Sequence, residues 1–173
     1  MYLSKTIISI GDKFLNPISL TNVSAPDQPL VYVNKAFRDL TKYENEFLIG
    51  RNCRFLQGVD SDKVAIARVK QAIKENAPIC QDLINYTGQD QKFYNRLVLL
   101  PFQEGDIQYF IGLQSIIEER QFRSRHSIDR MFLEDKVMNP LSIIVGQHMM
   151  GLPEMEENLT KTFIRIREFV SAL

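Results

Sequence analysis

Cys53 is the residue of this sequence whose side chain and neighbours most clearly suit chemistry. It lies in the segment 50–58, GRNCRFLQG, whose flanking glycines are typical of a loop that leads into a short helical turn. Sulfur is soft, readily oxidised and a good nucleophile, and these are the properties that a reversible covalent bond requires. No histidine in the segment is placed to act as a base, which favours activation of the thiol by something other than a lowered pKa.

The segment 50–58 resembles the signature of LOV domains, the flavin photosensors of the PAS superfamily. Further matches occur in the family's order: Tyr32-Val33-Asn34, Ala36-Phe37, Thr41, Tyr43, Ile84-Asn85-Tyr86, Phe93-Tyr94-Asn95 and Tyr109-Phe110-Ile111-Gly112-Leu113-Gln114. The resemblance covers roughly residues 18–115. It implies a PAS/LOV fold of the α+β class, with a five-stranded antiparallel sheet and flanking helices, followed by a C-terminal helical extension.

The resemblance also implies a photochemical cycle. FMN would be bound without a covalent link in the dark, and after blue-light excitation Cys53 would bond to flavin C4a while N5 takes up a proton. The bond would break thermally in the dark, so no substrate is consumed. Gln114 would offer its NH2 group to N5 in the dark and its carbonyl in the adduct, and this flip of the amide would pass the signal on to the helices that follow.

The family pattern assigns the contacts of the cofactor as well. Arg54 would grip the FMN phosphate, because a guanidinium suits a bidentate contact. Lys70 stands where the family often has a second arginine, with Arg68 two residues earlier. A lysine offers a point charge rather than a fork, which leaves FAD and riboflavin open beside FMN. The remaining expected contacts are polar groups for the ribityl chain and ring edge, and apolar walls: Asn52, Gln57, Asn85, Asn95, Leu56, Ile66, Leu97, Phe110 and Gly112.

Strands and helices must bring these residues together. Helices are predicted in 34–49, with Asn34 as a cap, and over 62–75, where Asp62 favours the N-terminal end. Strands are predicted where apolar runs are bounded by turn residues: around a Pro-bearing turn in 17–34, and at 79–86, 92–102 and 107–115. Their short connections predict antiparallel pairing.

Both faces of the predicted strands are apolar. Asn95 alternates with apolar residues on the face that it shares with Phe93 and Leu97, and a buried amide needs a partner such as a flavin edge. The opposite face carries Val98 and Leu100, among others, and must be covered by the chain's own helices or by a second subunit. A homodimer is the interpretation that we favour.

The expected organisation is an N-terminal cap helix (1–16), the flavin-binding domain (17–115) and a helical extension for dimerisation or output (116–173). Residues 135–146 faintly resemble the phosphoacceptor helix of sensor histidine kinases, but Asp135 stands where the histidine would be and no Gly-rich ATP-binding region follows. The sequence therefore predicts a photosensory signalling protein without enzymatic activity, acting on an unknown downstream protein.

The balance of charges and the positions of the two cysteines exclude several other classes of protein. The chain has 21 Lys or Arg and 21 Asp or Glu, whereas binding to nucleic acid or to an anionic membrane needs a basic surplus. Cys53 and Cys80 do not form a CxxC pair, so no metal site is expected. With no apolar run that could span a bilayer and no signal peptide, a cytoplasmic location is expected. Two alternatives remain open: a light-regulated DNA-binding tail, and a flavin redox sensor that uses Cys53.

Overall fold

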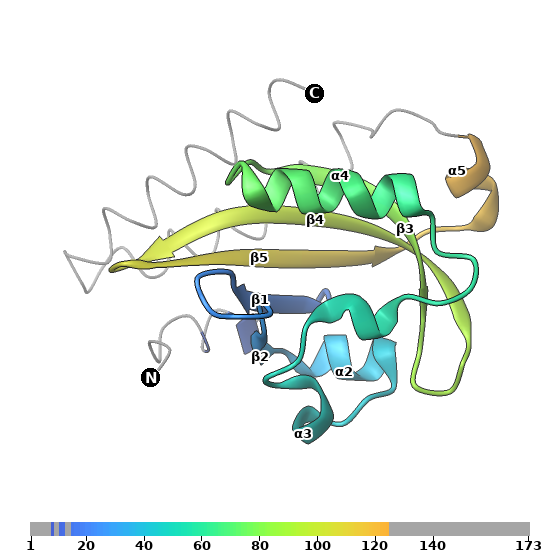
Figure 1. Ribbon diagram of the computed structural model, residues 1–173. Helices are drawn as coiled ribbons and strands as arrows, with labels where there is room; N and C mark the ends of the chain where they lie inside the picture. The colour runs from blue at the N-terminus through green and yellow to red at the C-terminus, as the bar shows by residue number, and fades with distance from the viewer. Residues whose placement is uncertain (1–7, 9–10, 13–14, 125–173) are drawn as a thin grey trace. The chain divides into compact units, whose positions relative to one another are not determined.

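Five antiparallel strands form one sheet in the order β2-β1-β5-β4-β3 (Figure 1). The computed structural model describes residues 8, 11–12 and 15–124. The strands are β1 (Ile18–Asn22), β2 (Leu30–Val33), β3 (Ile79–Tyr86), β4 (Lys92–Glu104) and β5 (Ile107–Ile116). The predicted α+β fold with a five-stranded antiparallel sheet is confirmed, and each predicted strand is present.

The connection from β2 to β3 carries all the helices that lie between strands. They are α2 (Lys35–Thr41), α3 (Asn45–Leu48), the 3-10 helix η1 (Cys53–Leu56) and α4 (Lys63–Lys74). Helix α4 packs against β3 at one edge of the sheet, whereas α2 contacts β1 and α3 contacts β2 at the other edge. The middle of the sheet, chiefly β5 and β4, is thus left free to face a cavity.

Two side chains cap these helices. The sequence predicts the Asn34 cap, whereas for Asp62 it predicts only a favourable charge at the start of the helix. The Asn34 side chain accepts a hydrogen bond from Phe37 N (3.0 Å), and that of Asp62 accepts one from Val64 N (2.7 Å). Each satisfies a backbone N–H group that the first turn of a helix leaves without a partner. Helix α2 ends at Lys42 with a φ of 58°, a left-handed conformation that normally favours glycine.

A cluster of buried side chains beneath the connection holds η1 in place. Its members are Leu30, Val33, Phe37, Leu48 and Leu56. Beside it, the Tyr43 and Phe47 rings are stacked with centroids 4.5 Å apart, and the Phe55 ring meets both edge-on. Because Phe55 belongs to η1, this packing fixes the orientation of the helix whose first residue is Cys53.

The last two strands are longer than the sequence pattern predicts. The β4–β5 ladder runs from Asn95↔Ile116 to Glu104↔Ile107, so only Gly105 and Asp106 remain for the turn. Gly105 has a φ of 58°, which a tight hairpin requires and which glycine adopts without strain. Strand β4 therefore continues past residue 102, and β5 includes Ile116, where we had expected the helical extension to begin.

The predicted terminal helices are described only in part. Ile8, Gly11 and Asp12 are helical, and Tyr32 Oη donates a hydrogen bond to Asp12 Oδ1 (2.6 Å). After β5, helix α5 (Glu119–Ser124) places the Phe122 ring 5.0 Å from that of Tyr94. The predictions for 125–173, including the kinase-like helix at 135–146 and the DNA-binding tail, lie outside the described residues. In the part of the chain that the structure describes, no helix combines the length and the apolar character needed to cross a membrane.

Candidate functional site

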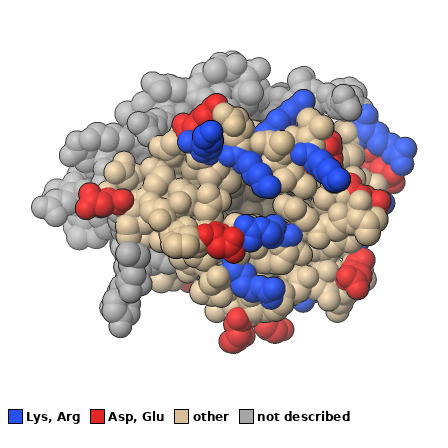
Figure 2. Space-filling view, viewed as in Figure 1, with Lys and Arg blue, Asp and Glu red and all other residues tan. Residues whose placement is uncertain are grey.

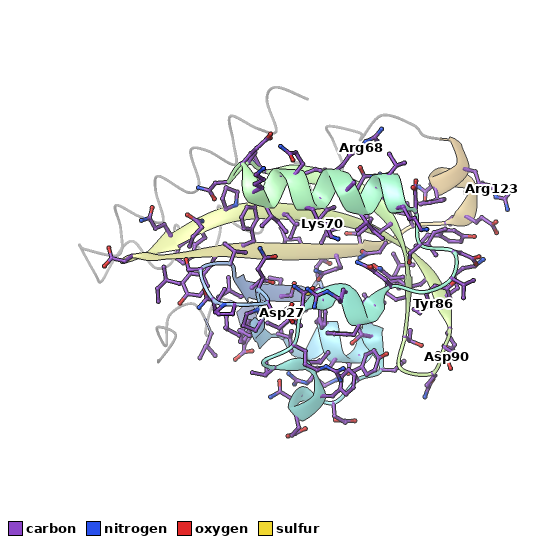
Figure 3. The ribbon with its side chains drawn as sticks, viewed as in Figure 1. Asp27, Arg68, Lys70, Tyr86, Asp90 and Arg123 are labelled. Carbon is purple, nitrogen blue, oxygen red and sulfur yellow. The ribbon has the colours of Figure 1, made fainter. Side chains whose placement is uncertain are left out.

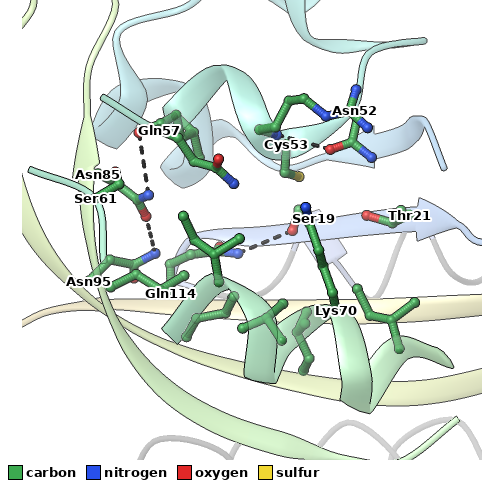
Figure 4. A pocket seen from close by; sticks show the side chains of 18 of the residues that line it. Ser19, Thr21, Asn52, Cys53, Gln57, Ser61, Lys70, Asn85, Asn95 and Gln114 are labelled. Carbon is green, nitrogen blue, oxygen red and sulfur yellow. Dashed lines mark hydrogen bonds between the residues drawn. The ribbon is translucent and has the colours of Figure 1, made fainter. Parts of the chain in front are cut away.

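A cavity of about 220 Å³ lies between the sheet and the connection from β2 to β3. This is several times the volume of one water molecule, so a ligand group can enter it. Alternate side chains of the strands form its floor, because every second residue of a strand points to the same face. The floor residues are Ser19, Thr21, Leu83, Asn85, Asn95, Leu97, Leu99, Phe110 and Gln114, several of which are labelled in Figure 4.

Helices η1 and α4 supply the other walls. Asn52, Cys53, Arg54, Leu56 and Gln57 come from η1 and the residues beside it, and Ile66, Val69, Lys70 and Ile73 come from α4. Gln28, Phe37, Ser61 and Asp62 complete the lining together with Ile84. The structure thus brings nearly all the predicted site residues to one cavity, from segments that lie far apart in the sequence.

Arg68 and Gly112 are the two predicted site residues that do not line the cavity. Arg68 is exposed on α4, because two steps along a helix turn a side chain by about 200° from Lys70. Gly112 lies in β5 directly opposite Ser19. A Cβ atom there would lie 2.6 Å from Ser19 Oγ and 2.9 Å from Gln114 Nε2. Gly112 therefore leaves room for two other side chains and does not form a wall itself.

The Cys53 side chain points into the cavity from the first residue of η1 (Figure 4). Asn52 caps this helix: its Oδ1 accepts a hydrogen bond from Arg54 N (3.0 Å), and its Nδ2 donates to Asp27 O (2.7 Å). Burial raises the pKa of the Cys53 thiol from 9.0 to about 11, although a hydrogen bond with Thr21 partly opposes this shift. The sulfur therefore remains a neutral thiol at physiological pH.

This raised pKa predicts slow alkylation of Cys53. In a Cys80→Ala variant, which leaves Cys53 as the remaining thiol, the rate with iodoacetamide near neutral pH should be about 100-fold below that of the unfolded chain, because two pKa units lower the thiolate fraction by that factor. The unfolded chain loses its proton first, so the contribution of Cys53 to folding stability is present below pH 9 and is lost as the pH rises towards about 11. An alkylation rate that rises with a midpoint between pH 7 and 9 in the folded protein would contradict this pKa.

Three buried amides on the floor of the cavity, those of Asn85, Asn95 and Gln114, form hydrogen bonds, and two of them keep an oxygen without a partner. Asn95 Nδ2 donates to Asn85 Oδ1 (3.0 Å), and Gln114 Nε2 donates to Ser19 Oγ (3.1 Å). Asn95 Oδ1 and Gln114 Oε1 are buried without a hydrogen-bond partner. A buried acceptor without a donor costs about 1–3 kcal/mol, so Asn95 Oδ1 indicates a ligand that carries an N–H group on its edge. Gln114 Oε1 must likewise meet a donor from the ligand, or the amide must reverse and accept from the Ser19 hydroxyl.

Basic side chains surround the mouth of the cavity. Figure 2 shows Lys and Arg side chains around a hollow on this face, and Figure 3 labels Lys70 and Asp27 in the same view. The Arg54 guanidinium makes a bidentate contact with the Asp27 carboxylate, at 2.6 and 3.0 Å. A guanidinium and an ammonium on opposite sides of the mouth suit an anionic group such as a phosphate.

Sequence reasoning missed the contribution of β1. Ser19 and Thr21 both face the cavity, and their spacing of two residues in a strand is the signal that would have placed them on one face. Gln28 and Ser61 lie in loops, and no local pattern indicates their position.

Comparisons with known proteins agree on one family. A family model described as a PAS domain matches residues 17–117. Phototropin-1A of Oryza sativa subsp. japonica is 42% identical over 114 residues, which are 65% of this chain and 12% of the phototropin. Blue-light-activated histidine kinase 2 of Erythrobacter litoralis is 36% identical over 137 residues, which are 75% of this chain and 40% of the kinase. The chain therefore spans less than half the length of either relative.

Solved structures of LOV domains have the same fold. The LOV domain of a blue-light-activated histidine kinase from Erythrobacter litoralis is 33% identical and superposes with a TM-score of 0.59, covering 62% of this chain and all of that domain. An RNA-binding light-oxygen-voltage receptor is 32% identical with a TM-score of 0.63, covering 70% of this chain and 35% of the receptor. Both identities are high enough to support common ancestry as well as a common fold.

Proposed function

The chain belongs to the PAS domain family and carries a LOV domain, and on this premise we propose that it is a blue-light photoreceptor that binds FMN. Cys53 would supply both the thiol that bonds reversibly to the photoexcited flavin and the proton that the flavin takes up. The reaction would reverse in the dark and return the proton to the Cys53 sulfur, so the cycle would consume only light. The observation that carries this proposal is the Cys53 thiol, which points into a cavity whose floor holds two buried acceptors without partners.

The polar residues of the cavity suit the parts of FMN. Arg54 and Lys70 at the mouth would hold the phosphate, and Asn52 and Gln57 would bind the ribityl chain. On the floor, Asn85 and Asn95 would bind the pyrimidine edge, where Asn95 Oδ1 has a lone pair to accept from an N–H group. The apolar walls would come from Leu56, Ile66, Leu97 and Phe110. When bound, the flavin supplies the absorption of blue light and the oxidising excited state.

The state of the Cys53 thiol favours this photochemistry over a redox sensor. Redox-sensing cysteines have a low pKa and are accessible to solvent, so that the thiolate reacts with small oxidants. Here burial raises the pKa to about 11, which suppresses the thiolate. A thiol that reacts only when a neighbouring flavin is excited does not need a lowered pKa.

Absorption spectra of the purified chain test the proposal directly. We expect a structured blue absorption band that bleaches under blue light and recovers in the dark. A colourless protein that cannot be loaded with added FMN would refute the proposal. A band that responds to reductant but not to light would instead support the redox sensor.

Arg54 provides a test of the phosphate site. An Arg54→Gln variant should bind FMN about 10-fold more weakly, because a hydrogen bond to a charged group contributes about 1.5–3 kcal/mol and exposure at the mouth weakens it. Riboflavin has no phosphate, and its affinity should change by less than about twofold. Fluorescence titration of the apoprotein with each flavin measures both affinities.

Arg68→Gln is the matched control, because Arg68 is an exposed arginine on α4 that does not line the cavity. It should leave both affinities unchanged. If Arg54→Gln lowered the affinities for FMN and riboflavin equally, Arg54 would contribute to the folding of η1 and not to the binding of the phosphate.

The helical extension and subunit contacts are where we expect the light signal to leave the flavin-binding domain. We infer a homodimer that signals through the helical extension, without enzymatic activity of its own, to a downstream protein. Two relatives are named as blue-light-activated histidine kinases, and the matched region covers 40% and 21% of their lengths, which supports a sensory role for this region. Sedimentation in the dark and in the light should reveal a change in mass or shape, and identical profiles would exclude a rearrangement of subunits.

A further inference from the structure

A serine hydroxyl on β1 occupies an unusual position in the cavity. The side chain of Ser19 faces the cavity floor, Ser19 is only 3% exposed, and its Oγ accepts a hydrogen bond from Gln114 Nε2 (3.1 Å). A buried hydroxyl requires a partner, and so does a buried amide. Ser19 and Gln114 therefore satisfy one another across the β1–β5 ladder, although 95 positions separate them in the chain.

Gly112 makes this contact possible. It is the direct register partner of Ser19 on β5, and any Cβ atom at this position would overlap Ser19 Oγ and crowd Gln114 Nε2. The missing side chain leaves the space in which the hydroxyl and the amide meet. The local structure is thus built for this hydrogen bond.

The chemistry of the pair allows two arrangements. A hydroxyl can donate or accept, whereas the two ends of a glutamine amide have fixed roles. In the structure the NH2 group donates to Ser19, and Oε1 is buried at the cavity without a partner. If the amide turns by half a rotation, Oε1 accepts from the Ser19 hydroxyl and the NH2 group faces the cavity. Ser19 satisfies either end, which alanine or valine cannot do.

Strand β1 connects this pair to the segment that precedes it. Ile18 N donates to Asn34 Oδ1 (2.9 Å), and Asn34 Nδ2 donates to Asn16 O (2.9 Å) and to Gly11 O (3.2 Å). Gln114 N in turn donates to Pro17 O (3.0 Å). A change at Ser19 therefore acts on a strand whose first residue is hydrogen-bonded to the Asn34 side chain, which also binds the backbone carbonyls of Gly11 and Asn16.

We propose that Ser19 is a positioning residue that pairs with either end of the Gln114 amide and transmits the orientation of that amide to β1 and to the segment before it. The proposal rests on the proposed function, since light is what reverses the amide. In the dark, Oε1 would accept from the Ser19 hydroxyl while the NH2 group faces the flavin. Reversal of the amide then turns the Ser19 hydroxyl from donor to acceptor, the arrangement that the structure shows, and so changes the hydrogen bond that joins β1 to β5. The N-terminal side of the sheet thereby receives the signal, in addition to the residues that follow β5.

Hydrogen exchange of the full chain tests this inference. Amide exchange in Ile18–Asn22 is compared between dark and illuminated protein, with the extent of adduct matched by absorbance. We expect a light-dependent change in the wild type, its loss in Ser19→Ala, and its retention in Ser19→Thr, which keeps the hydroxyl. Infrared difference spectra with labelled glutamine should show a light-induced shift of the Gln114 carbonyl band that is altered in Ser19→Ala.

Two further variants keep the test decisive. Gly112→Ala should abolish the change in β1 as Ser19→Ala does, because its Cβ separates the pair without removing either group. Ser115→Ala, on the opposite face of β5, should retain the change. The inference would be overturned if light changed hydrogen exchange equally in wild type and Ser19→Ala, or if the wild type bleached without any change in exchange. Neither result would contradict the proposed function. Absence of bleaching in the wild type would overturn the proposed function as well.

Discussion

A Cys53→Ala variant should lose light-induced bleaching completely while it retains a yellow, flavin-bound form. Cys53 supplies the thiol that faces the cavity, and an alanine methyl has no atom that can bond to the ring. The absorption of the variant should therefore stay constant under blue light, apart from slow photodamage. Repeated spectra during illumination and subsequent dark incubation measure this loss.

Cys80→Ala is the control for this variant. Cys80 lies on β3, does not line the cavity, and has a thiol whose pKa burial raises to about 12. Its replacement should leave bleaching and recovery intact. Reversible bleaching that persists in Cys53→Ala would show that the photochemistry does not use this sulfur.

The largest effect on stability is expected from Phe37→Ala. Phe37 is 1% exposed at the centre of the cluster that packs η1 against α2 and α3, and removal of such a ring leaves a void that costs about 3–5 kcal/mol. Domains of this size are stable by only about 5–15 kcal/mol, so a large part of the folding free energy would be lost. Urea denaturation of the flavin-free protein isolates this effect, because Phe37 also lines the cavity.

Val64→Ala is the matched control on α4. Val64 is 60% exposed, and its truncation should change the free energy of unfolding by no more than about 0.5 kcal/mol. If Phe37→Ala lowered the free energy of unfolding by less than about 1 kcal/mol, the surrounding side chains would have collapsed into the void. Cys53 would then not depend on this cluster for its position.

Local patterns were sufficient to predict most of the sheet and much of the site. The strands β3, β4 and β5 are long apolar runs separated by turn residues, and their connections are short enough to impose antiparallel pairing. The Asn34 cap could be predicted because Asn34 directly precedes its helix, whereas Asp62 was expected only to favour the start of its helix through its charge. The residues predicted to bind the cofactor were brought together in the prediction because the segment 50–58 resembles a family signature, and not because any spacing required them; the structure shows that most of them line one cavity.

The features that escaped prediction depend on pairing between distant segments. Strand β1 spans only Ile18–Asn22, and nothing within it indicates that it lies beside β5. Ser19 could therefore not be connected with Gln114, although their alternation within each strand was visible. Gly112 was expected to form part of an apolar wall because the family pattern places it beside the cofactor. Its actual role becomes apparent only when the strand opposite it is known.

The ion pair between Asp27 and Arg54 has a consequence for how the cofactor is loaded. Both side chains are more than half exposed, and Asn52 holds the backbone carbonyl of Asp27, so the carboxylate is fixed beside the guanidinium. A phosphate that approaches Arg54 therefore meets a guanidinium that is already paired with the Asp27 carboxylate. Binding of the proposed FMN would therefore be an ion exchange, in which dissolved salt weakens both the Asp27–Arg54 pair and the attraction between Arg54 and the phosphate.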